Sequence, residues 1–505
     1  MRKYNKAACI YEEMDKILEK LDLSKKVSKE DYNRIMEELG ERLGRAQRLA
    51  RDAKKPVLIV FEGWRGARRS ALINEMMQQM DARGFNVYST VRMSEEEHEQ
   101  PFFTFFWRHL PALGHIAVYH RSWYYLKNAH EVRGHGDRCK CLNISYEHIN
   151  NFEKMLTDDN YLVIKFFLHL SNEQQKKNID KNAKTLGKAW RDLSPALDES
   201  EEYAAYLERY ERMLEATDKV NAPWHLIAAE DGRSARIDVF TTLVETIENA
   251  VHAPQAEAAL PVRSASNYDV LSKIYANKEL SKEEYKEKLD KYQKKLSQLQ
   301  IEMFKAQIPV VIGFEGWDAA GKGGAIRRLT AALDPLGFAV HPVAAPNVVE
   351  KQFHYQWRFW INLPTPGNIA IFDRTWYGRV MVERIEGFAK PQEWQRAYDE
   401  IKDMEAQWAE HGVAIAKFWL QIDKDEQLRR FNDRQSDPDK QWKITDEDWR
   451  NRDKWGAYEA AVNEMLVRTD TSYAPWTVVE GNNKYYARLK VLKTVIDLFE
   501  KKLGK

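Results

Sequence analysis

The residues whose types and spacing could do chemistry are concentrated in one short run, Gly316-Trp317-Asp318-Ala319-Ala320-Gly321-Lys322-Gly323-Gly324. Two glycines separated by four residues allow successive backbone N–H groups to turn onto phosphate oxygens, and the lysine adds a point charge. An apolar run at 309–314 precedes the loop, and a helix-compatible stretch follows it. This context predicts a phosphate-binding loop and argues against a glycine-rich turn without a ligand.

One position of this loop departs from the usual pattern. Gly323 stands where a serine or threonine normally holds magnesium. Asp318, inside the loop, would repel a bound phosphate unless a cation lay between them. Asp318 is therefore the expected replacement ligand for Mg²⁺.

A second motif supplies further candidates for metal binding and charge stabilisation. An apolar run ends in Asp373-Arg374-Thr375-Trp376-Tyr377-Gly378-Arg379. At the carboxyl edge of a parallel sheet, beside the strand before the loop, Asp373 would complete the magnesium site with Asp318. Arg374 and Arg379 would face negative charge on a phosphoryl group, unless they form structural salt bridges. Glu383 offers another acid for the metal, directly or through water.

A third cluster is basic and follows the predicted strand at 413–422. Its candidate contacts with a polyanion are Arg430, Arg434, Lys440 and Lys443. Phosphoryl-transfer kinases carry a mobile lid at this position, which closes basic groups over phosphates and excludes water. The alternative is an ordinary solvated surface helix, which most charge runs are.

The chain contains the same organisation twice. Phe61-Glu62-Gly63-Trp64 matches Phe314-Glu315-Gly316-Trp317, and Arg121-Ser122-Trp123-Tyr124 matches Arg374-Thr375-Trp376-Tyr377. Both pairs are offset by 253 residues, whereas solenoid repeats recur at about 20 to 50 residues. We therefore predict duplication of one whole domain, with a first copy at 1–251, a linker at 252–267 and a second copy at 268–505.

The two predicted copies differ where the chemistry should occur. The second copy has Asp318, Gly321, Lys322, Asp373 and Glu383, and the first has in their places Arg65, Arg68, Arg69, His120 and His130. The candidate metal-binding acids are lost, and an arginine side chain enters the space in which backbone must approach a phosphate. We expect the first copy to be catalytically inactive and to hold no magnesium.

The composition narrows the classes of function. A formal net charge of +1 argues against a basic surface for nucleic acid or membrane. The sequence has no apolar stretch of 18 residues or more and begins with a charged segment instead of a signal sequence. Three cysteines suit a reducing compartment, and the spacing of Cys139 and Cys141 is not that of a zinc site. We expect a cytoplasmic protein with no nucleic-acid or membrane partner.

The elements that must position these residues alternate along the second copy. Helix-compatible stretches separate apolar runs at 309–314, 338–343, 368–372, 413–422 and 476–479. The pattern predicts an α/β fold in which helices cover both faces of a parallel sheet. A capping box at 281–284 predicts the start of a helix, and Ser28 starts the equivalent helix of the first copy.

These motifs together resemble the polyphosphate kinase 2 family. The resemblance rests on the loop 316–324, the motif 373–379, the run 383–388 and the stretch 437–443. It covers essentially all of the second copy and, in diluted form, the first. Two fused copies with only the second intact resemble the family's class II, the polyphosphate:AMP phosphotransferases.

The resemblance implies a P-loop kinase fold with a helical lid, Mg²⁺ as cofactor, inorganic polyphosphate as donor and AMP as acceptor. The family's loop aspartate and lysine fall on Asp318 and Lys322, and its second-motif acid and arginine fall on Asp373 and Arg374. Its basic lid residues correspond to Arg430, Arg434, Lys440 and Lys443.

The motifs alone indicate only magnesium-dependent phosphoryl transfer, and the expected reaction is the reversible conversion of AMP to ADP. The alternatives are an ATP-dependent nucleotide kinase, a polyphosphate-dependent kinase of nucleoside diphosphates, and a non-catalytic nucleotide-sensing scaffold. The sequence leaves open the acceptor preference, the polymer length and whether the protein is a homo-oligomer.

Overall fold

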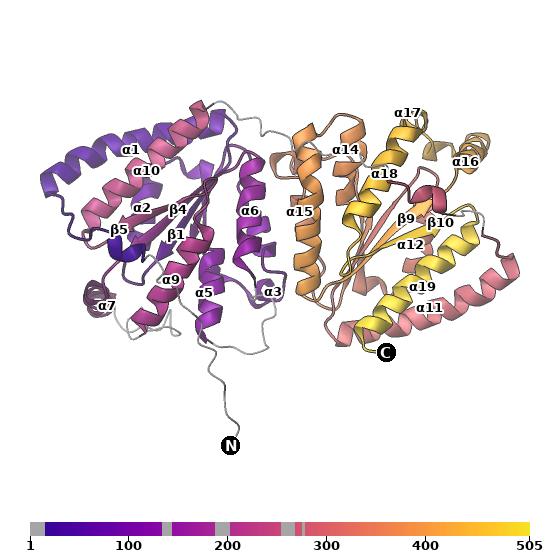
Figure 1. Cartoon of the computed structure of the whole chain (residues 1–505), viewed down its shortest axis with the longest axis horizontal. Coiled ribbons are helices and arrows are strands. Elements are labelled where there is room, and N and C mark those ends of the chain that lie inside the picture. Colours follow the sequence, from indigo (N-terminus) through magenta and orange to yellow (C-terminus); the bar gives the residue numbers. More distant parts are fainter. Residues whose placement is uncertain (1–15, 134–143, 187–201, 254–267, 275–277) are drawn as a thin grey trace, which may run out of the picture. The chain divides into compact units, whose positions relative to one another are not determined.

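The computed structural model describes residues 16–133, 144–186, 202–253, 268–274 and 278–505. The chain forms two compact units (Figure 1). Unit 1 comprises Met1–Arg92, Pro111–Arg133 and Ser145–Ala253, and unit 2 comprises Met93–Leu110, Gly134–Ile144 and Pro254–Lys505. The short segment 93–110 thus belongs to the second unit, where its helix α4 (Thr104–Arg108) packs against α13 (Trp357–Trp360).

Unit 1 is built on a five-stranded parallel sheet with the order β2-β3-β1-β4-β5. Its strands are β1 (Val57–Gly63), β2 (Phe85–Tyr88), β3 (Ile116–His120), β4 (Leu162–His169) and β5 (Trp224–Ala228). The central strands β1, β3 and β4 are almost wholly buried, as expected when helices cover both faces of a parallel sheet.

The sheet of unit 2 repeats this topology in the order β10-β9-β6-β8-β7. Its strands are β6 (Val310–Gly316), β7 (Phe338–Pro342), β8 (Ile369–Asp373), β9 (Ala414–Gln421) and β10 (Trp476–Glu480). Each lies within two residues of an apolar run in the sequence. The predicted α/β fold with a duplicated parallel sheet is therefore confirmed.

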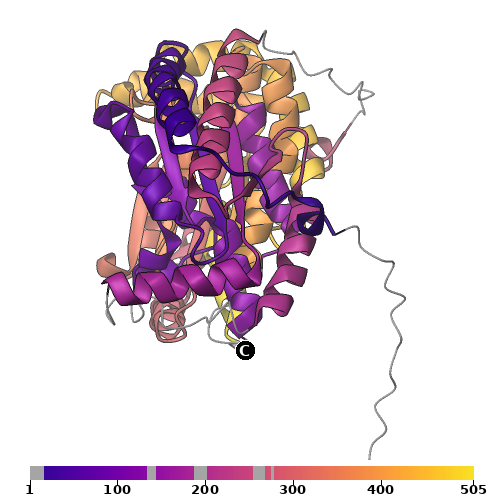
Figure 2. The same cartoon turned by 90° about the vertical axis from the view of Figure 1, so that its left-hand side faces the viewer.

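Helices cover both faces of the sheet in unit 1 (Figures 1 and 2). The long helices α1 (Lys29–Asp52) and α10 (Gly232–His252) pack side by side on one face. The others are α2 (Arg69–Gln78), α5 (Trp123–Arg133), α6 (Tyr146–Asp158), α7 (Asn172–Leu186) and α9 (Tyr203–Thr217). Helix α1 begins as predicted, because the Ser28 side chain accepts a hydrogen bond from the N–H of Asp31.

The helices of unit 2 follow the same plan. Helices α11 (Lys282–Lys305) and α19 (Lys484–Lys502) pack together, and Ser281 and Glu284 form the predicted capping box of α11. The others are α3 (Glu95–His98), α12 (Lys322–Thr330), α14 (Val382–Ile385), α15 (Pro391–Glu410), α16 (Lys424–Ser436), α17 (Asp446–Asp453) and α18 (Trp455–Thr469).

A buried ion pair recurs at the same place in both units. In unit 2, Lys417 Nζ lies 2.8 Å from Glu405 Oε2 and also donates to the Tyr377 hydroxyl and the Thr469 carbonyl. Trp376 donates its indole N–H to the other oxygen of Glu405 at 2.9 Å. Unit 1 repeats every one of these contacts with Lys165, Glu153, Tyr124, Thr217 and Trp123.

The Trp-Tyr pair of the second motif is therefore part of the scaffold, because it serves the same purpose in both units. Residues that differ between the units are the better candidates for chemistry.

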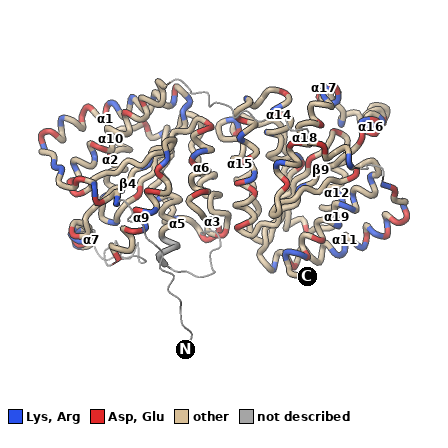
Figure 3. Tube along the Cα trace, viewed as in Figure 1, with Lys and Arg blue, Asp and Glu red and all other residues tan. Residues whose placement is uncertain are grey.

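Acidic and basic residues are mixed along the helices of both units (Figure 3), which agrees with the near-zero net charge. Among the described residues, none of the helices combines the length and apolar character needed to cross a bilayer.

Candidate active site

The predicted phosphate loop connects the end of β6 to the start of α12. Gly316 has a φ of 151°, and a Cβ there would lie 2.7 Å from the Leu420 carbonyl oxygen, so no other residue fits without a shift. Gly321 forms the N-cap of α12 with a φ of 112°. The loop thus turns sharply, and the N–H groups at the start of α12 are directed to the carboxyl edge of the sheet.

Lys322 is folded back onto its own loop. Its Nζ donates to the Gly316 carbonyl at 2.6 Å, and the Trp317 carbonyl lies 3.4 Å away. In the described part of the chain no carboxylate forms an ion pair with this ammonium group, although the buried Glu315 interacts with it electrostatically. An arriving phosphate would therefore compete for it mainly with backbone carbonyls.

Helix α16 holds the loop from the other side through Arg430. The guanidinium donates to the carbonyls of Ala319 and Ala320 at 2.9 and 3.0 Å, and to those of Gly481 and Asn482 at 2.6 and 3.0 Å. Only 3% of the Arg430 side chain is exposed. This position differs from the one expected of a lid residue, since its donors are occupied by carbonyls of the loop, by carbonyls after β10 and by Glu426.

The remaining basic candidates of the third cluster do lie on an exposed segment. Lys440 forms an ion pair with Asp437, and Arg434 donates to the Lys443 carbonyl at 2.9 Å. The Lys443 ammonium lies 5.0 Å from the centre of the exposed Trp442 ring. The charged groups of this exposed segment stay hydrated, so a polyanion could reach them.

Asp318 lies where the loop meets the second motif and the helix α17. Its Oδ2 accepts a hydrogen bond from the Asn451 amide at 2.9 Å, and Arg374 Nη2 lies 3.7 Å from its Oδ1. Arg374 adopts a left-handed φ of 67° and donates its N–H to the Phe314 carbonyl at 3.0 Å. The turn after β8 is thereby fixed against β6, with the arginine side chain at the loop.

The buried Glu315 fixes the same turn. Its Oε1 accepts from both the N–H and the hydroxyl of Thr375, each at 2.7 Å, and burial raises the pKa of this carboxyl. Glu62 and Ser122 form the corresponding bonds in unit 1, so this is another element of scaffold and not of chemistry.

Asp373 ends β8 directly beside Phe314 of β6, as the sequence predicts. Its carboxylate has no hydrogen-bond or ion-pair partner within the described residues. Asp318 and Asp373 thus supply the oxygen donors that Mg²⁺ prefers. The described part of the chain has no group of three or more His, Cys, Asp or Glu side chains that could hold a metal. Magnesium binding by Asp318 and Asp373 therefore stays a prediction, and Asp373 is not among the residues that line the cavity at the loop.

Arg379 and Glu383 occupy a different environment. Arg379 Nη1 lies 2.8 Å from Glu383 Oε2, and Nη2 lies 3.5 Å from Glu393. The Arg379 guanidinium also lies over the Tyr355 ring, 4.8 Å from its centre. Neither residue lines the cavity at the phosphate loop. The structure therefore pairs these two candidates with each other and does not bring them to Asp318.

A cavity at the loop gathers residues that the sequence patterns did not single out. The polar ones are Gln427 from α16, Glu447 and Asn451 from α17, and Tyr458 from α18, and Met381 and Val382 are the apolar ones. Trp317 also lines it and stacks on Trp455 of α18 at a centroid distance of 3.8 Å. The sequence marks Trp317, because it lies in the loop and is repeated by Trp64, which stacks on Tyr203 in unit 1. The polar residues come from distant helices and had no motif to mark them.

The matching place in unit 1 lacks this chemistry. Arg68 takes the position of Gly321 with a left-handed φ of 58°, and the buried Arg69 donates to the Gly63 carbonyl. His120 replaces Asp373, and its pKa is lowered to about 3, mainly by burial and further by Arg69 and Arg121. His120 is therefore neutral near pH 7. The side chain of His130, like Cys139 and Cys141, lies outside the described residues.

Replacing Arg430 by methionine is expected to destabilise unit 2 by about 2 kcal/mol, because buried loop carbonyls would lose a charged donor. Chemical denaturation measures this effect. Arg429→Met is the matched control, since Arg429 pairs with the same Glu426 but is 58% exposed, and its loss should cost at most about 0.5 kcal/mol. Equal effects of the two substitutions would mean that Arg430 does not support the loop.

Comparison with known proteins finds the same family twice along the chain. The family model described as polyphosphate kinase 2 matches twice, over residues 26–255 and 279–504. A polyphosphate:AMP phosphotransferase of Pseudomonas aeruginosa is 41% identical over 492 residues, which cover 96% of this chain and 99% of that protein. A protein of the same name from Pseudomonas syringae is 38% identical over 96% of this chain and 98% of its own. A crystal structure described as a polyphosphate kinase 2 from Pseudomonas aeruginosa superposes with a TM-score of 0.83 at 39% identity, covering 95% of this chain and 97% of that one.

Proposed function

The chain belongs to the polyphosphate kinase 2 family, and we propose that it transfers a phosphoryl group from inorganic polyphosphate to AMP. The relatives that match nearly its whole length are named for this activity. Unit 2 carries the reaction, and unit 1 is a non-catalytic copy of the same fold.

One observation carries this proposal. Asp318, Lys322 and Arg374 line a single cavity at the end of β6, although they come from two motifs more than 50 residues apart. An acid, an ammonium and a guanidinium around helix N-terminal N–H groups form a site for a phosphoryl group that carries several negative charges. Unit 1 keeps the surrounding scaffold but has no acid at the corresponding positions.

The proposed step is an in-line displacement. A phosphate oxygen of AMP forms a bond to the terminal phosphorus of the chain, while the anhydride bond to the next phosphate breaks and its electron pair leaves with the shortened chain. The products are ADP and a polyphosphate with one phosphate fewer. Because one anhydride replaces another, the reaction is reversible.

The residues of the site bind and stabilise charge. Lys322 and the first N–H groups of α12 hold phosphoryl oxygens, and Arg374 neutralises charge that develops on the transferring group. Asp318 and Asp373 would hold Mg²⁺, which supplies charge neutralisation to the phosphates when it is bound. No general base is required, because the attacking oxygen of AMP is already an anion.

The test is a turnover assay with long-chain polyphosphate, AMP and MgCl₂, in which ADP formation is the expected result. ATP in place of polyphosphate tests for an ATP-dependent nucleotide kinase. ADP or GDP in place of AMP tests for a kinase of nucleoside diphosphates. Faster turnover with ATP as donor, or with ADP or GDP as acceptor, than with polyphosphate and AMP would contradict the proposed reaction. No turnover in any combination would favour a non-catalytic scaffold.

Replacing both Lys440 and Lys443 by alanine is expected to raise the half-saturating concentration of polyphosphate and to flatten its dependence on salt. Fewer counterions are then released when the polyanion binds, by analogy with nucleic acids. Initial rates over a range of NaCl concentrations measure the slope. Lys493 and Lys501 on the exposed face of α19 provide a matched double substitution that should leave it unchanged. An unchanged slope in the first variant would assign Lys440 and Lys443 to an ordinary solvated surface.

A further inference from the structure

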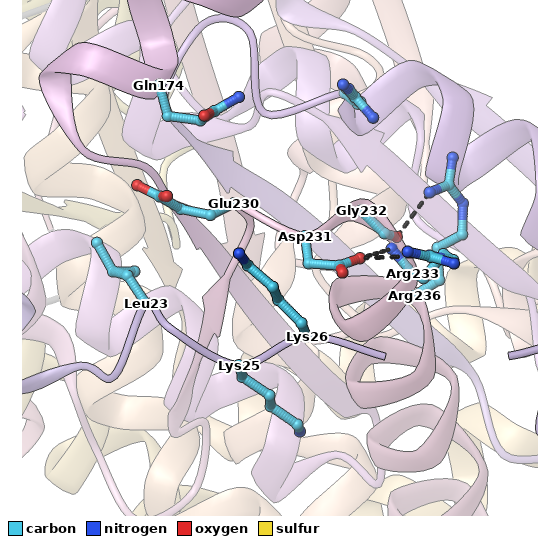
Figure 4. Close-up of a pocket in the computed structure, with 10 residues that line it drawn as sticks. Leu23, Lys25, Lys26, Gln174, Glu230, Asp231, Gly232, Arg233 and Arg236 are labelled. Carbon is cyan, nitrogen blue, oxygen red and sulfur yellow. Dashed lines mark hydrogen bonds and ion pairs between the residues drawn. The ribbon is translucent and has the colours of Figure 1, made fainter. Parts of the chain in front are cut away.

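A second cavity lies within unit 1, at the N-terminal end of α10 and the turn that replaces the phosphate loop (Figure 4). Its volume is about 400 Å³. Cationic side chains outnumber acidic ones in its lining, because Glu230 and Asp231 are accompanied by Lys25, Lys26, Arg68, Arg233 and Arg236. The cavity is therefore suited to an anion.

The carboxylates of Asp231 and Glu230 accept hydrogen bonds from uncharged donors. Asp231 caps α10 and accepts hydrogen bonds from the N–H groups of Arg233 and Ser234 at 2.7 and 3.3 Å. Glu230 accepts from the hydroxyl of Ser171. Among the described residues, only Arg233 approaches one of these acids closely enough to count as an ion pair, with its Nε 3.8 Å from Asp231. Both acids keep their negative charge. With Glu75 and Asp238, which pair with Arg236 and Lys25, four acids stand beside five cations, so a small excess of positive charge remains.

Two of the cations are free to meet a ligand. Arg236 is engaged by Glu75 and by the Gly232 carbonyl, and Lys25 is 2.6 Å from Asp238. Within the described residues, Lys26 and Arg68 have no hydrogen-bond or ion-pair partner for their side chains. Figure 4 shows Lys26 extending toward the acids of the cavity, whereas Lys25 extends away from them.

Arg68 lines the same cavity and comes from the turn that replaces the phosphate loop. Its Nη1 lies 3.2 Å from the point where a Cβ on Gly232 would stand, so the guanidinium covers the first residue of α10. Arg68 is also the residue that replaces the second glycine of the phosphate loop. An arginine in place of this glycine prevents the backbone from approaching a phosphate closely. The same arginine adds a planar guanidinium, whose N–H donors suit phosphate oxygens.

We propose that this cavity is a non-catalytic binding site for an inorganic phosphate chain, in which Lys26 and Arg68 contact the phosphate oxygens. Of the described residues that line it, Leu23 has the one apolar side chain and none is aromatic. A nucleoside base normally takes apolar or aromatic contacts, so the lining favours the chain over a nucleotide. The proposal goes beyond the transfer reaction, because it assigns a ligand to the unit that lacks the catalytic acids.

Hydrogen exchange of the full-length protein, followed by mass spectrometry with tripolyphosphate as the probe, tests this site. We expect slower exchange in peptides that contain residues 20–28 and 229–240. In the double variant Lys26→Ala/Arg68→Ala, the tripolyphosphate concentration that gives half-maximal protection should rise about tenfold or more, since hydrogen bonds to charged groups are lost. The matched control Arg48→Ala/Lys181→Ala removes the same charge from exposed positions outside the cavity and should leave the concentration unchanged.

Three results would overturn the proposal. They are no protection of these peptides, protection that survives in Lys26→Ala/Arg68→Ala, and equal protection by AMP or by sulfate at the same concentration. Peptides that cover 316–324 report in the same experiment whether the loop of unit 2 binds the chain. The two sets of peptides therefore distinguish a chain that does not bind at the loop of unit 2 from one that does not bind in the cavity of unit 1.

Discussion

Replacing Asp318 by asparagine is expected to lower turnover with polyphosphate and AMP by about a hundredfold or more. The substitution keeps the size of the side chain but removes the charge that lies 3.7 Å from Arg374 and beside the phosphate loop. Folding should change little, because among the described residues the Asp318 carboxylate accepts one hydrogen bond, from Asn451, and an amide oxygen can accept it equally. Initial rates over a range of Mg²⁺ concentrations, together with thermal unfolding, measure both effects.

The duplicated chain supplies the control for this experiment. Arg65 is the counterpart of Asp318 in unit 1, and Arg65→Ala should leave the rate within about twofold, as a substitution away from the chemistry usually does. Asp318→Asn should also require more Mg²⁺ for half-maximal activity. Near-wild-type activity of this variant at limiting magnesium would show that Asp318 is not a ligand.

The fold could be predicted from the sequence because each buried parallel strand is a continuous apolar run. The run at 368–372 became β8 and placed Asp373 beside Phe314, since strand order in this topology brings the second motif next to the loop. The loop itself was predictable for a similar reason. Its glycines are required by backbone geometry at two positions, which leaves a local signal in the sequence.

Side-chain partners across the fold could not be predicted in the same way. Arg430 and Arg434 look alike in a charged helical stretch, yet Arg430 is buried against four carbonyls, whereas the Arg434 guanidinium contacts the backbone of the exposed segment. Which side of a helix faces the loop depends on packing. Arg379 and Glu383 are four residues apart, a spacing that suits a mutual ion pair as well as a shared ligand.

Comparison of the two units separates scaffold from chemistry more sharply than either unit alone. The ion pair of Lys417 with Glu405 is repeated by Lys165 with Glu153, and all four side chains are at most 1% exposed. Unit 1 keeps this pair although it has lost the candidate catalytic acids. The pair is therefore expected to serve stability and not turnover.

Replacing Lys417 by methionine is expected to destabilise unit 2 by about 3–5 kcal/mol, because it leaves the Glu405 carboxylate buried without its counter-charge. Lys165→Met should destabilise unit 1 by a similar amount, since Lys165 Nζ lies 2.8 Å from Glu153 just as Lys417 Nζ lies 2.8 Å from Glu405. Native-state hydrogen exchange measures the stabilities of the two units separately.

Lys417→Met should lower protection in β6, β8 and β9, and Lys165→Met in β1, β3 and β4. Lys417→Met should also leave initial rates near wild type at low temperature, where unit 2 remains folded. A large loss of rate with unchanged protection would instead place Lys417 in the chemistry of the site.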